Sequence, residues 1–566
     1  MGAILFDGET NFKELIFKEI VQENNPEINS NSIITFQNCI FKRAFILEKI
    51  KAKEISFIDC IFEKECVLSD SEINIIGFTE CNLKINFKLT TNESSAKTIL
   101  REIKSPEVII SGNYQNLQIV GSTIQKMTIG DINDNSSKKD SKIEFLVDNN
   151  IEKLTINPFS TYSSLSFHKS IYDDITFQGN FYNDLVFKDK IQCKGIYFES
   201  SVFTQRIDFE EGNFDDVNFY RSSFDGLIHI NDFKNMGEDF HRDLVITKLC
   251  FHSCTFDKDV SVSIEKIESL DISNNNFKQL LNFDNRTINT ENMVMISINR
   301  LNRGSIVLER AYFDLWFSGI NFGDIFIKDS LIWNISLSEL NNKGSISLTN
   351  VKKGKFFTIH NSNSGNLHFI NTNINNFEEI IIADSNLDGL DTSIYPTKVL
   401  SYSKDERTGF GLSDKSKNRQ NLKNVYNQLK QITKKKQDIH MMFKYRSLEY
   451  KNLLLGKKIN FDTILLSLNW LSNNNGKSWF RGILFTLVMA FLFYWLYISS
   501  VGQTLEHNLW WKEYILFISS FPSLNLEKYE TFNSEWYASL IIWLGRIFIS
   551  YGIYQTVAAF RKYGKA

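Results

Sequence analysis

The sequence predicts a mainly β fold, a parallel β-helix (solenoid), followed by an α-helical neck and two transmembrane helices. Three observations predict it: phenylalanine recurs at fixed intervals through the first two thirds, a Lys-rich heptad pattern comes next, and two long apolar runs come last. The 566 residues include 48 Phe but only 5 Pro and 27 Gly. Because proline removes a backbone N–H donor from a strand ladder, its scarcity agrees with continuous strands.

The repeat is 21 residues long in the first coils. The segments ITFQNCIF, ISFIDCIF and IGFTECNL begin at residues 34, 55 and 76 and align without gaps. Their shared columns are Phe36, Phe57 and Phe78, then Cys39, Cys60 and Cys81, then Phe41, Phe62 and Leu83. The same 21-residue period returns later in the chain at Phe177, Phe198 and Phe219. Such self-similarity indicates a repeat architecture.

Within each repeat, phenylalanines are spaced by five residues, as at Phe209, Phe214, Phe219 and Phe224. A helix predicts a spacing of about 3.6 and a simple strand about 2. A coil with four short sides, each with one inward side chain, fits both observed intervals. Asn, Ser, Asp and Gly follow many of the inward positions and suit tight corners between the sides.

This pattern resembles the pentapeptide-repeat family, whose members are right-handed parallel β-helices with a central Leu or Phe in each five-residue unit. The resemblance covers residues from about 10 to 395, which implies about 18 coils. The period of this chain, usually 21 residues, is one residue longer than the family's. The five-residue spacing is lost over residues 85–160 and 225–245, where we expect distorted coils or insertions.

Composition divides the chain into four segments. We expect an N-terminal cap at residues 1–25, the pentapeptide-repeat-like β-helix at 26–398, a basic helical neck with an interfacial helix at 399–478, and two transmembrane helices with a re-entrant loop at 479–566. The first 400 residues hold 40 basic and 55 acidic residues, a net charge of −15, and the next 100 hold 17 and 6, a net charge of +11. Segments this different usually face different surroundings.

In the neck, apolar residues follow an a/d pattern over about five heptads. The candidates for an oligomerisation seam are Leu422, Val425, Leu429, Ile432, Ile439 and Phe443. Two interpretations stay open: one amphipathic helix that packs on the end of the solenoid, or a seam through which the chain forms a homo-oligomer. Residues 459–471 then alternate apolar and polar side chains, as expected of a helix at a membrane surface.

Residues 482–501 form an uncharged apolar run of 20 residues, long enough to span a bilayer. Residues 536–560 form a second run whose one charge is Arg546. Basic residues flank the two runs and an acidic loop separates them, so the positive-inside rule places both termini and the solenoid in the cytoplasm. We expect a multi-pass protein of a bacterial inner membrane, in contact with the lipid bilayer.

The apolar stretch between the runs, residues 509–524, is too short to cross and suits a re-entrant or interfacial segment. The order helix, short re-entrant helix, helix is similar to the subunit plan of tetrameric cation channels. The tail YQTVAAFRKYGKA resembles bacterial pentapeptide-repeat proteins that end in an ion-channel-like pair of spans. At the place of a Thr-Val-Gly-Tyr-Gly potassium filter the loop has Ser519, Ser520, Phe521, Pro522 and Ser523. Potassium selectivity is therefore not supported.

Arg546 lies near the midplane of the second run, where a charge is costly and usually functional. Three interpretations stay open: a pore-facing or gating charge, a structural partner of an acidic group or carbonyl, or a snorkelling side chain. The helical stripe that is our candidate for the pore or a helix contact comprises Ser539, Trp543, Arg546, Ser550 and Tyr554. Gly545 and Gly552 mark a neighbouring line where helices can approach closely.

No pattern predicts catalysis, a metal site or a cofactor. The column of Cys39, Cys60 and Cys81 lacks the paired spacing of a zinc site, so we expect a buried ladder of reduced thiols. Gly476-Lys477-Ser478 is similar to the end of a phosphate loop, but Leu471 stands where that motif requires its first glycine. We therefore do not expect an enzyme.

Two functions follow from these expectations. In the first, the cytoplasmic solenoid binds a protein or a small signalling ligand, and the oligomerised two-span domain forms an ion-channel-like pore. The alternative is a membrane-tethered binding scaffold without pore activity, including a DNA-mimicking solenoid that binds a topoisomerase. A net charge of −15 spread over about 18 coils is weak for such mimicry, and we do not expect nucleic-acid binding. A polysaccharide lyase or hydrolase conflicts with the cytoplasmic orientation.

Overall fold

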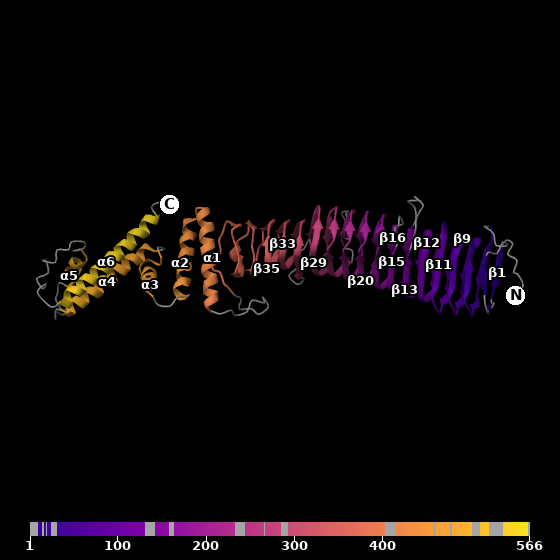
Figure 1. Cartoon of the computed structure of the whole chain (residues 1–566), viewed down its shortest axis with the longest axis horizontal. Helices are drawn as coiled ribbons and strands as arrows, with labels where there is room; N and C mark the ends of the chain where they lie inside the picture. Colours follow the sequence, from indigo (N-terminus) through magenta and orange to yellow (C-terminus); the bar gives the residue numbers. More distant parts are fainter. Residues whose placement is uncertain are drawn as a thin grey trace. The chain divides into compact units, whose positions relative to one another are not determined.

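The computed structural model describes residues 9–13, 16–17, 20–23, 31–130, 142–157, 164–231, 244–264, 266–284, 293–401, 415–456, 460–475, 478–500, 510–519 and 536–563 of the chain. Two compact units are present. Unit 1 comprises Met1–Thr358, Ser362–Glu378 and Asp391–Ile394, and unit 2 comprises Ile359–Asn361, Glu379–Leu390 and Tyr395–Ala566. Unit 1 is a β-solenoid, and unit 2 combines the last solenoid residues with the helices (Figure 1).

The described residues contain 40 strands, paired in parallel. The first are β1 (Glu9–Lys13), β2 (Ile16–Phe17), β3 (Ile20–Glu23), β4 (Ile33–Gln37), β5 (Ile40–Phe41), β6 (Phe45–Glu48), β7 (Lys51–Ile58), β8 (Ile61–Phe62), β9 (Cys66–Thr79), β10 (Asn82–Leu83), β11 (Phe87–Arg101), β12 (Lys104–Val120) and β13 (Thr123–Gly130). The middle ones are β14 (Lys142–Phe145), β15 (Asn150–Asn157), β16 (Ser164–Phe167), β17 (Ile171–Phe177), β18 (Asn180–Phe181), β19 (Leu185–Phe187), β20 (Ile191–Glu199), β21 (Val202–Phe203), β22 (Ile207–Phe209), β23 (Gly212–Tyr220), β24 (Ser223–Phe224), β25 (Ile228–Asn231), β26 (Leu244–His252), β27 (Thr255–Phe256) and β28 (Val260–Ser263). The last are β29 (Lys266–Phe277), β30 (Leu280–Asp284), β31 (Met293–Asn302), β32 (Ser305–Glu309), β33 (Tyr312–Asn321), β34 (Asp324–Lys328), β35 (Leu331–Asn342), β36 (Ser345–Thr349), β37 (Gly354–His360), β38 (Asn366–Ile370), β39 (Phe377–Ala383) and β40 (Leu390–Thr392).

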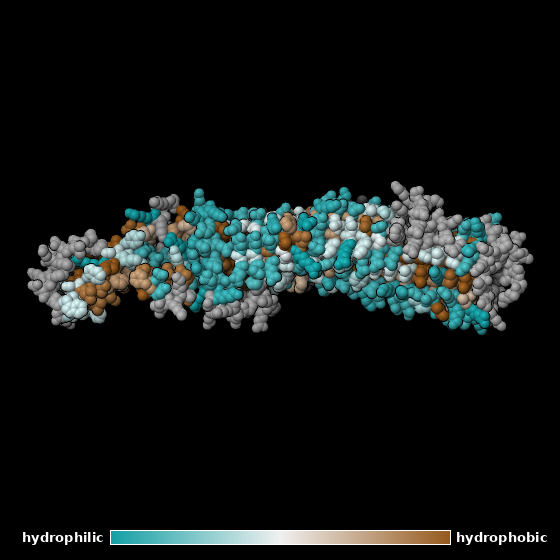
Figure 2. Space-filling view, in the orientation of Figure 1, coloured by the Kyte–Doolittle hydropathy of each residue, from teal (hydrophilic) through white to brown (hydrophobic). Residues whose placement is uncertain are grey.

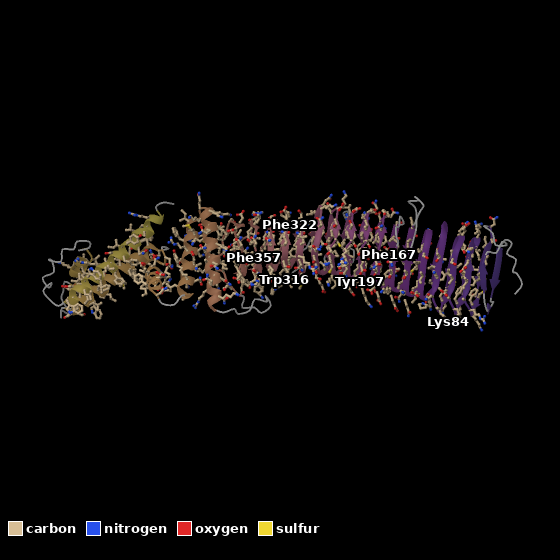
Figure 3. All side chains as sticks on the ribbon, in the orientation of Figure 1. Lys84, Phe167, Tyr197, Trp316, Phe322 and Phe357 are labelled. Atoms are coloured by element: carbon tan, nitrogen blue, oxygen red, sulfur yellow. The ribbon has the colours of Figure 1, made fainter. Side chains whose placement is uncertain are left out.

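Stacked phenylalanines form ladders inside the coils, as the 21-residue period predicts. The ring centres of Phe177 and Phe198 are 5.0 Å apart, and those of Phe198 and Phe219 are 4.5 Å apart, with the rings nearly parallel. The other stacks include Phe181, Phe203, Phe224, Phe256 and Phe277, and also Phe145, Phe167, Phe187 and Phe209. Figure 3 shows Phe167 among the coils and Lys84 projecting outward. The abundance of phenylalanine is therefore a property of the solenoid core.

The sides of the coils meet at corners with left-handed backbone. Residues of this kind in the first coils are Asn38, Asp59 and Glu80, with φ of 54°, 49° and 55°. A small polar side chain follows the corner and links adjacent coils: the Ser201 N–H donates to the Ser222 hydroxyl over 3.1 Å, and the Ser201 hydroxyl donates to the Phe177 carbonyl over 3.0 Å. The Cys60 thiol takes the same place, 3.5 Å from the Phe36 carbonyl oxygen. These side chains satisfy backbone groups that the corner would otherwise leave buried and unpaired.

The later coils contain a ladder of buried asparagines. The Asn302 amide donates to Asn321 Oδ1, and the Asn321 amide donates to Asn342 Oδ1, both over 2.8 Å. The Asn342 amide donates in turn to the Ser364 carbonyl. Because each amide reaches the next coil, these polar side chains stay hydrogen-bonded although they are buried.

The solenoid over residues 33–392 has about 15 turns, fewer than the 18 or so we expected. The coils are unequal in length: Phe219 pairs with Phe251 instead of a residue 21 positions on, and residues 232–243 between them lie outside the described chain. Residues 87–130 lie within the region where the five-residue spacing is lost. They form the long strands β11, β12 and β13, which pair in parallel, and the register of β11 with β12 shifts between Thr91 and Lys97. In the segment expected to be a cap, β1, β2 and β3 pair in parallel with β4, β5 and β6.

Six described α-helices follow the solenoid, and one short 3₁₀ turn lies within its last coils. They are a 3₁₀ turn at Ile374–Asn376 between β38 and β39, α1 (Lys415–Lys435), α2 (Ile439–Gly456), α3 (Phe461–Asn473), α4 (Trp479–Ser500), α5 (Trp510–Ser519) and α6 (Trp536–Tyr563). The predicted five-heptad neck is two helices, because the chain turns at Gln437, whose φ is 61°. A capping box starts α3: the Thr463 N–H donates to Asn460 Oδ1 and the Asn460 N–H donates to Thr463 Oγ1.

Within unit 2, the neck helices pack on the last solenoid residues. The Gln428 amide of α1 donates to the Ser385 carbonyl over 2.9 Å and accepts from the Leu387 N–H over 2.7 Å. The Tyr445 hydroxyl of α2 donates to the Pro396 carbonyl over 2.7 Å. Burial raises the pKa of Tyr445, so the phenol keeps the proton that makes this bond. A helix packed on the end of the solenoid was one of the two interpretations left open.

Candidate functional site

Helices α4 and α6 pack closely through glycine and threonine. A Cβ atom added at Gly552 would lie 2.3 Å from Thr486 Oγ1, and one added at Gly482 would lie 2.5 Å from Thr556 Oγ1. Each threonine hydroxyl is held by its own helix: Thr486 Oγ1 donates to the Gly482 carbonyl and Thr556 Oγ1 to the Gly552 carbonyl. Close approach at small residues is typical of paired membrane helices, and it confirms Gly552 as part of a contact line.

The short helix α5 packs against both longer helices. The Tyr514 hydroxyl donates to the Leu487 carbonyl in α4 over 2.8 Å, and the Tyr494 hydroxyl of α4 donates to the Trp510 carbonyl over 3.1 Å. Phe517 is buried in the apolar cluster that α4 and α6 share. Because Leu487 lies well inside α4, α5 runs beside this helix, the position that a re-entrant segment requires.

The outer surfaces of α4 and α6 are apolar. Both helices are long and apolar enough to cross a membrane, yet only 44% of the residues in the most apolar window of α4 and 28% in that of α6 are buried. The large apolar side chains exposed on α4 include Ile483, Leu484, Leu487, Val488, Phe491, Leu492, Trp495 and Leu496. Figure 2 shows brown surface over these helices, whereas the solenoid surface in view is mostly teal and white. A helix in the core of a soluble protein would instead be mostly buried.

Helix α3 continues this exposed apolar surface. Four of its exposed apolar side chains share one face: Phe461, with Ile464 and Leu465 three and four residues later, and Leu471 seven residues after Ile464. Trp470 is also exposed, outside this face. The opposite side of its C-terminal end is fixed by polar contacts: the Asn473 amide donates to the Gln555 side chain of α6, and the Ser447 hydroxyl of α2 donates to Asn474 Oδ1. The neck and the α4–α6 pair are thus joined through α3.

The predicted α6 stripe does not face α4. The residues of α6 buried against the rest of unit 2 are Ala538, Ile542, Gly545, Ile549, Gly552 and Ala559. The stripe lies on the adjacent face: Trp543 and Tyr554 are exposed, and Ser539, Arg546 and Ser550 are half-buried. The structure brings Arg546 and Ser550 together, because the Ser550 hydroxyl donates to the Arg546 carbonyl.

The Arg546 guanidinium has an unpaired donor. Its Nη2 atom is buried and has no hydrogen-bond partner among the residues that the structure describes. An unpaired charged donor away from water costs several kcal/mol. The role expected of Arg546 stays a prediction, and the structure adds the observation that the described residues supply no acceptor for this donor.

The predicted loop residues fall at the edge of what the structure describes. Ser519 is the last residue of α5, and Ser520, Phe521 and Pro522 lie outside the described residues. Their predicted position at an ion filter is therefore not tested by the structure.

The predicted oligomerisation residues are mostly covered within the chain. Val425, Leu429, Ile432 and Phe443 are buried, and Leu422 and Ile439 are half-buried. Their apolar faces are used where α1 and α2 pack together and on the last coil. Homo-oligomerisation through this seam would require the contacts of α1 and α2 within the chain to open. It stays a prediction.

The cysteines are buried or half-buried free thiols. Burial raises the pKa of Cys254 to about 12 and that of Cys66 well above its ordinary range, and the thiolate is the form that binds metals or attacks substrates. Among the described residues, no group of three or more His, Cys, Asp or Glu side chains could hold a metal ion.

No family model, no curated protein and no solved structure was found to match this chain. Sequence reasoning missed the tyrosines that bind α5 to α4 and the threonines opposite Gly482 and Gly552, since hydroxyl groups in an apolar run carry no periodic signal. The spacing of seven between Gly545 and Gly552 was the signal that did indicate the contact.

Proposed function

We propose that the protein is a membrane-anchored solenoid whose α4 and α6 cross a lipid bilayer. The outward-facing apolar side chains of both helices support this proposal, because acyl chains would bury the surface that the protein itself leaves open. The same two helices make their polar contacts inward, as the Gly–Thr pairs and the Tyr514 hydroxyl do. These contacts need no water, as expected of donors inside a bilayer.

The surroundings of α4 and α6 fit an interface. The exposed face of α3 suits a helix that lies at the membrane surface. Exposed tryptophans begin all three helices of this region, Trp479 in α4, Trp510 and Trp511 in α5 and Trp536 in α6, and Trp495 is exposed in the second half of α4. The basic neck would be attracted to an anionic leaflet at about 1 kcal/mol per basic residue. If the basic neck lies against the anionic inner leaflet of a bacterial inner membrane, the solenoid and both termini are on its cytoplasmic side.

The anchor is tested by alkaline extraction of membranes that contain the full chain. A variant with Leu484→Asp and Val488→Asp, two exposed positions on α4, should be released from the membrane fraction, since each charge costs about 2.5–3.5 kcal/mol at a span centre. The matched control, Ile171→Asp with Ile370→Asp, changes two similarly exposed residues of the solenoid and should be retained like the wild type. Release of the wild type itself would overturn the anchor.

A second candidate function is an ion-channel-like pore formed by several copies. The buried Arg546 donor, which has no acceptor among the described residues, favours it, because a neighbouring subunit or a water-filled lumen could supply one. The placement of α5 beside α4 also fits a channel subunit. One pair of spans cannot enclose a pore, so this function requires a homo-oligomer, with the solenoid as the part that binds the controlling partner.

The pore is tested by conductance of the full chain in liposomes, with its mass in detergent as the second reading. Arg546→Gln should change the conductance, whereas Arg561→Gln, on the exposed C-terminal end of the same helix, should not. A monomeric mass with no conductance overturns the pore and leaves the alternative, an anchored binding scaffold.

A further inference from the structure

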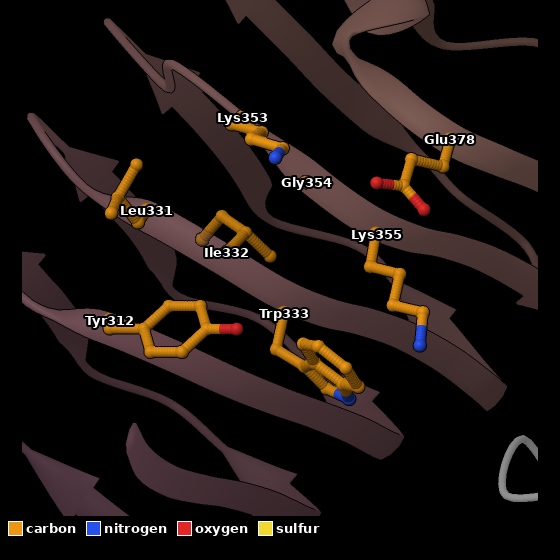
Figure 4. A pocket seen from close by; sticks show the side chains of 8 residues that line it. All are labelled: Tyr312, Leu331, Ile332, Trp333, Lys353, Gly354, Lys355 and Glu378. Atoms are coloured by element: carbon orange, nitrogen blue, oxygen red, sulfur yellow. The ribbon is translucent and has the colours of Figure 1, made fainter. Parts of the chain in front are cut away.

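A pocket of about 220 Å³ opens on the surface of the later coils, wholly within unit 1. It is formed by side chains from four successive coils (Figure 4). Its lining comprises Tyr312 of β33, Leu331, Ile332 and Trp333 of β35, Lys353 before β37, Gly354 and Lys355 of β37, and Glu378 of β39. The site is separate from α4 and α6 and does not depend on their membrane placement.

A bulge in β35 places the pocket's tryptophan. Phe313 pairs with Ile332 and Asp314 pairs with Asn334, so Trp333 between them has no partner in β33. A β-bulge of this kind turns a side chain out of the regular alternation and is common beside functional sites. Inward residues on either side, Ile332 and Asn334, stay buried, and Trp333 is left half-exposed in the wall of the pocket.

Gly354 forms part of the pocket wall. A Cβ atom added at Gly354 would lie 2.2 Å from the buried Phe377 ring, so no side chain fits at this position. Glycine thus lets the Phe377 ring pack against the backbone of β37 behind the pocket. In Figure 4 the Lys353 ammonium and the Glu378 carboxylate point toward one another across Gly354.

The tryptophan is held in place by a cation and a ring. The Lys355 ammonium lies 4.1 Å from the centre of the Trp333 ring and 5.0 Å from that of Phe356. Trp333 and Phe356 meet edge to face with their centres 6.1 Å apart. These contacts fix the indole before any ligand arrives, which lowers the entropic cost of binding against it.

Opposite charges stand at the mouth. Neither the Lys353 ammonium nor the Glu378 carboxylate has an ion-pair partner among the described residues. With an aromatic and aliphatic floor below, the pocket presents one free cation, one free carboxylate and two aromatic rings. A ligand that uses all of these has a flat ring for Trp333 and Tyr312, an anionic group for Lys353 and an N–H or O–H donor for Glu378.

We propose that this pocket binds a small anionic ligand built on a flat heteroaromatic ring. The volume is smaller than the roughly 300–1,000 Å³ of drug-sized sites, so it takes one or two fused rings with a short anionic arm. A nucleoside monophosphate and an aromatic carboxylate share this chemistry. The solenoid thereby carries a small-molecule site on a rigid wall of stacked strands.

The proposal is tested by calorimetric titration of the full chain in detergent. The probes are AMP, indole-3-acetate, adenosine and inorganic phosphate. We expect AMP or indole-3-acetate to bind at one site per chain, and adenosine and phosphate to bind about tenfold more weakly, because each lacks half of the recognised groups. Whichever of AMP and indole-3-acetate binds more tightly shows whether the recognised anion is a phosphate or a carboxylate. Binding of no ring-bearing anion, or equally tight binding of phosphate alone, overturns the proposal.

Variants locate the site. Trp333→Leu and Lys353→Gln should each weaken binding by about tenfold. Lys353 is exposed, so its substitution leaves the fold intact and keeps the test valid if Trp333→Leu folds poorly. The matched control is Lys343→Gln, which removes a similar ammonium 5.0 Å from the Phe322 ring elsewhere on the solenoid, and it should bind like the wild type. Unchanged binding in Lys353→Gln contradicts the proposed site.

Discussion

Asp314 is a carboxyl group that β33 buries inside the solenoid. Its Oδ1 accepts a hydrogen bond from the Asn334 amide on the next coil over 3.0 Å. Burial raises the pKa of Asp314, and the Asn334 bond opposes this only in part. Asp271 has a pKa raised mainly by burial too. Such residues make the stability of the solenoid depend on pH.

We predict that Asp314→Asn stabilises the protein more at high pH than at low pH. A raised pKa means that the folded chain binds the proton more tightly than the unfolded chain, so the wild type loses stability as pH rises from about 4, the ordinary aspartate value, through the folded pKa. Asparagine keeps an oxygen for Asn334 and never ionises. The measurement is the free energy of unfolding of both proteins at pH 4 and pH 8. A difference that stays constant or shrinks with pH would contradict this account.

At the scale of elements, each coil depends on its two neighbours. Phe198 of β20 stacks on Phe177 below and Phe219 above. In such a quasi-one-dimensional fold, stability is set by the coil and its nearest interfaces. Damage to one ladder position should therefore stay local.

We predict that Phe198→Ala destabilises the solenoid by about 3–5 kcal/mol, because it leaves a cavity between stacked rings. Hydrogen exchange should rise in β17, β20 and β23 and stay unchanged in the distant strands β4 to β8. Tyr220→Ala is the control: this ring stacks on His252 at the surface, and its removal should change exchange little. A uniform loss of protection along the solenoid would refute nearest-neighbour stacking.

How far the sequence predicts these elements depends on whether a side chain repeats. The columns through Phe57 and Phe198 repeat over several successive coils, so one pattern indicated strands, register and core together. The turn at Gln437 could not be seen in the sequence, because Ile432 before it and Ile439 after it are seven residues apart. The heptad pattern therefore continues across the turn as if one helix were present. The pocket at Trp333 was also missed, since a bulge is a single unpaired residue with no period.

At the scale of the whole molecule, charge and hydropathy divide the chain in the same way as the fold. The solenoid region is acidic, the neck is basic, and exposed apolar side chains gather on α3, α4 and α6. The lengths of the segments, their net charges and the composition of the two apolar runs were enough to predict the order of solenoid, neck and apolar helices. The partner of Arg546 could not be predicted, because none of the described residues supplies an acceptor for its Nη2 atom.

The central claim, that α4 and α6 cross a bilayer, predicts which residues lie on the same side. All seven native cysteines lie at or before Cys254, so the helical part of the chain offers a background free of cysteine for labelling. Single variants Lys417→Cys, Glu506→Cys and Lys565→Cys place one thiol in the neck, one between the spans and one at the tail.

The most direct test is reaction of these three variants with a membrane-impermeant maleimide in sealed, oriented vesicles. The account predicts that positions 417 and 565 react from one side and position 506 only from the other, with the wild type as the control for native thiols. Reaction of all three from the same side would mean that the helices do not cross, and it would contradict the membrane anchor.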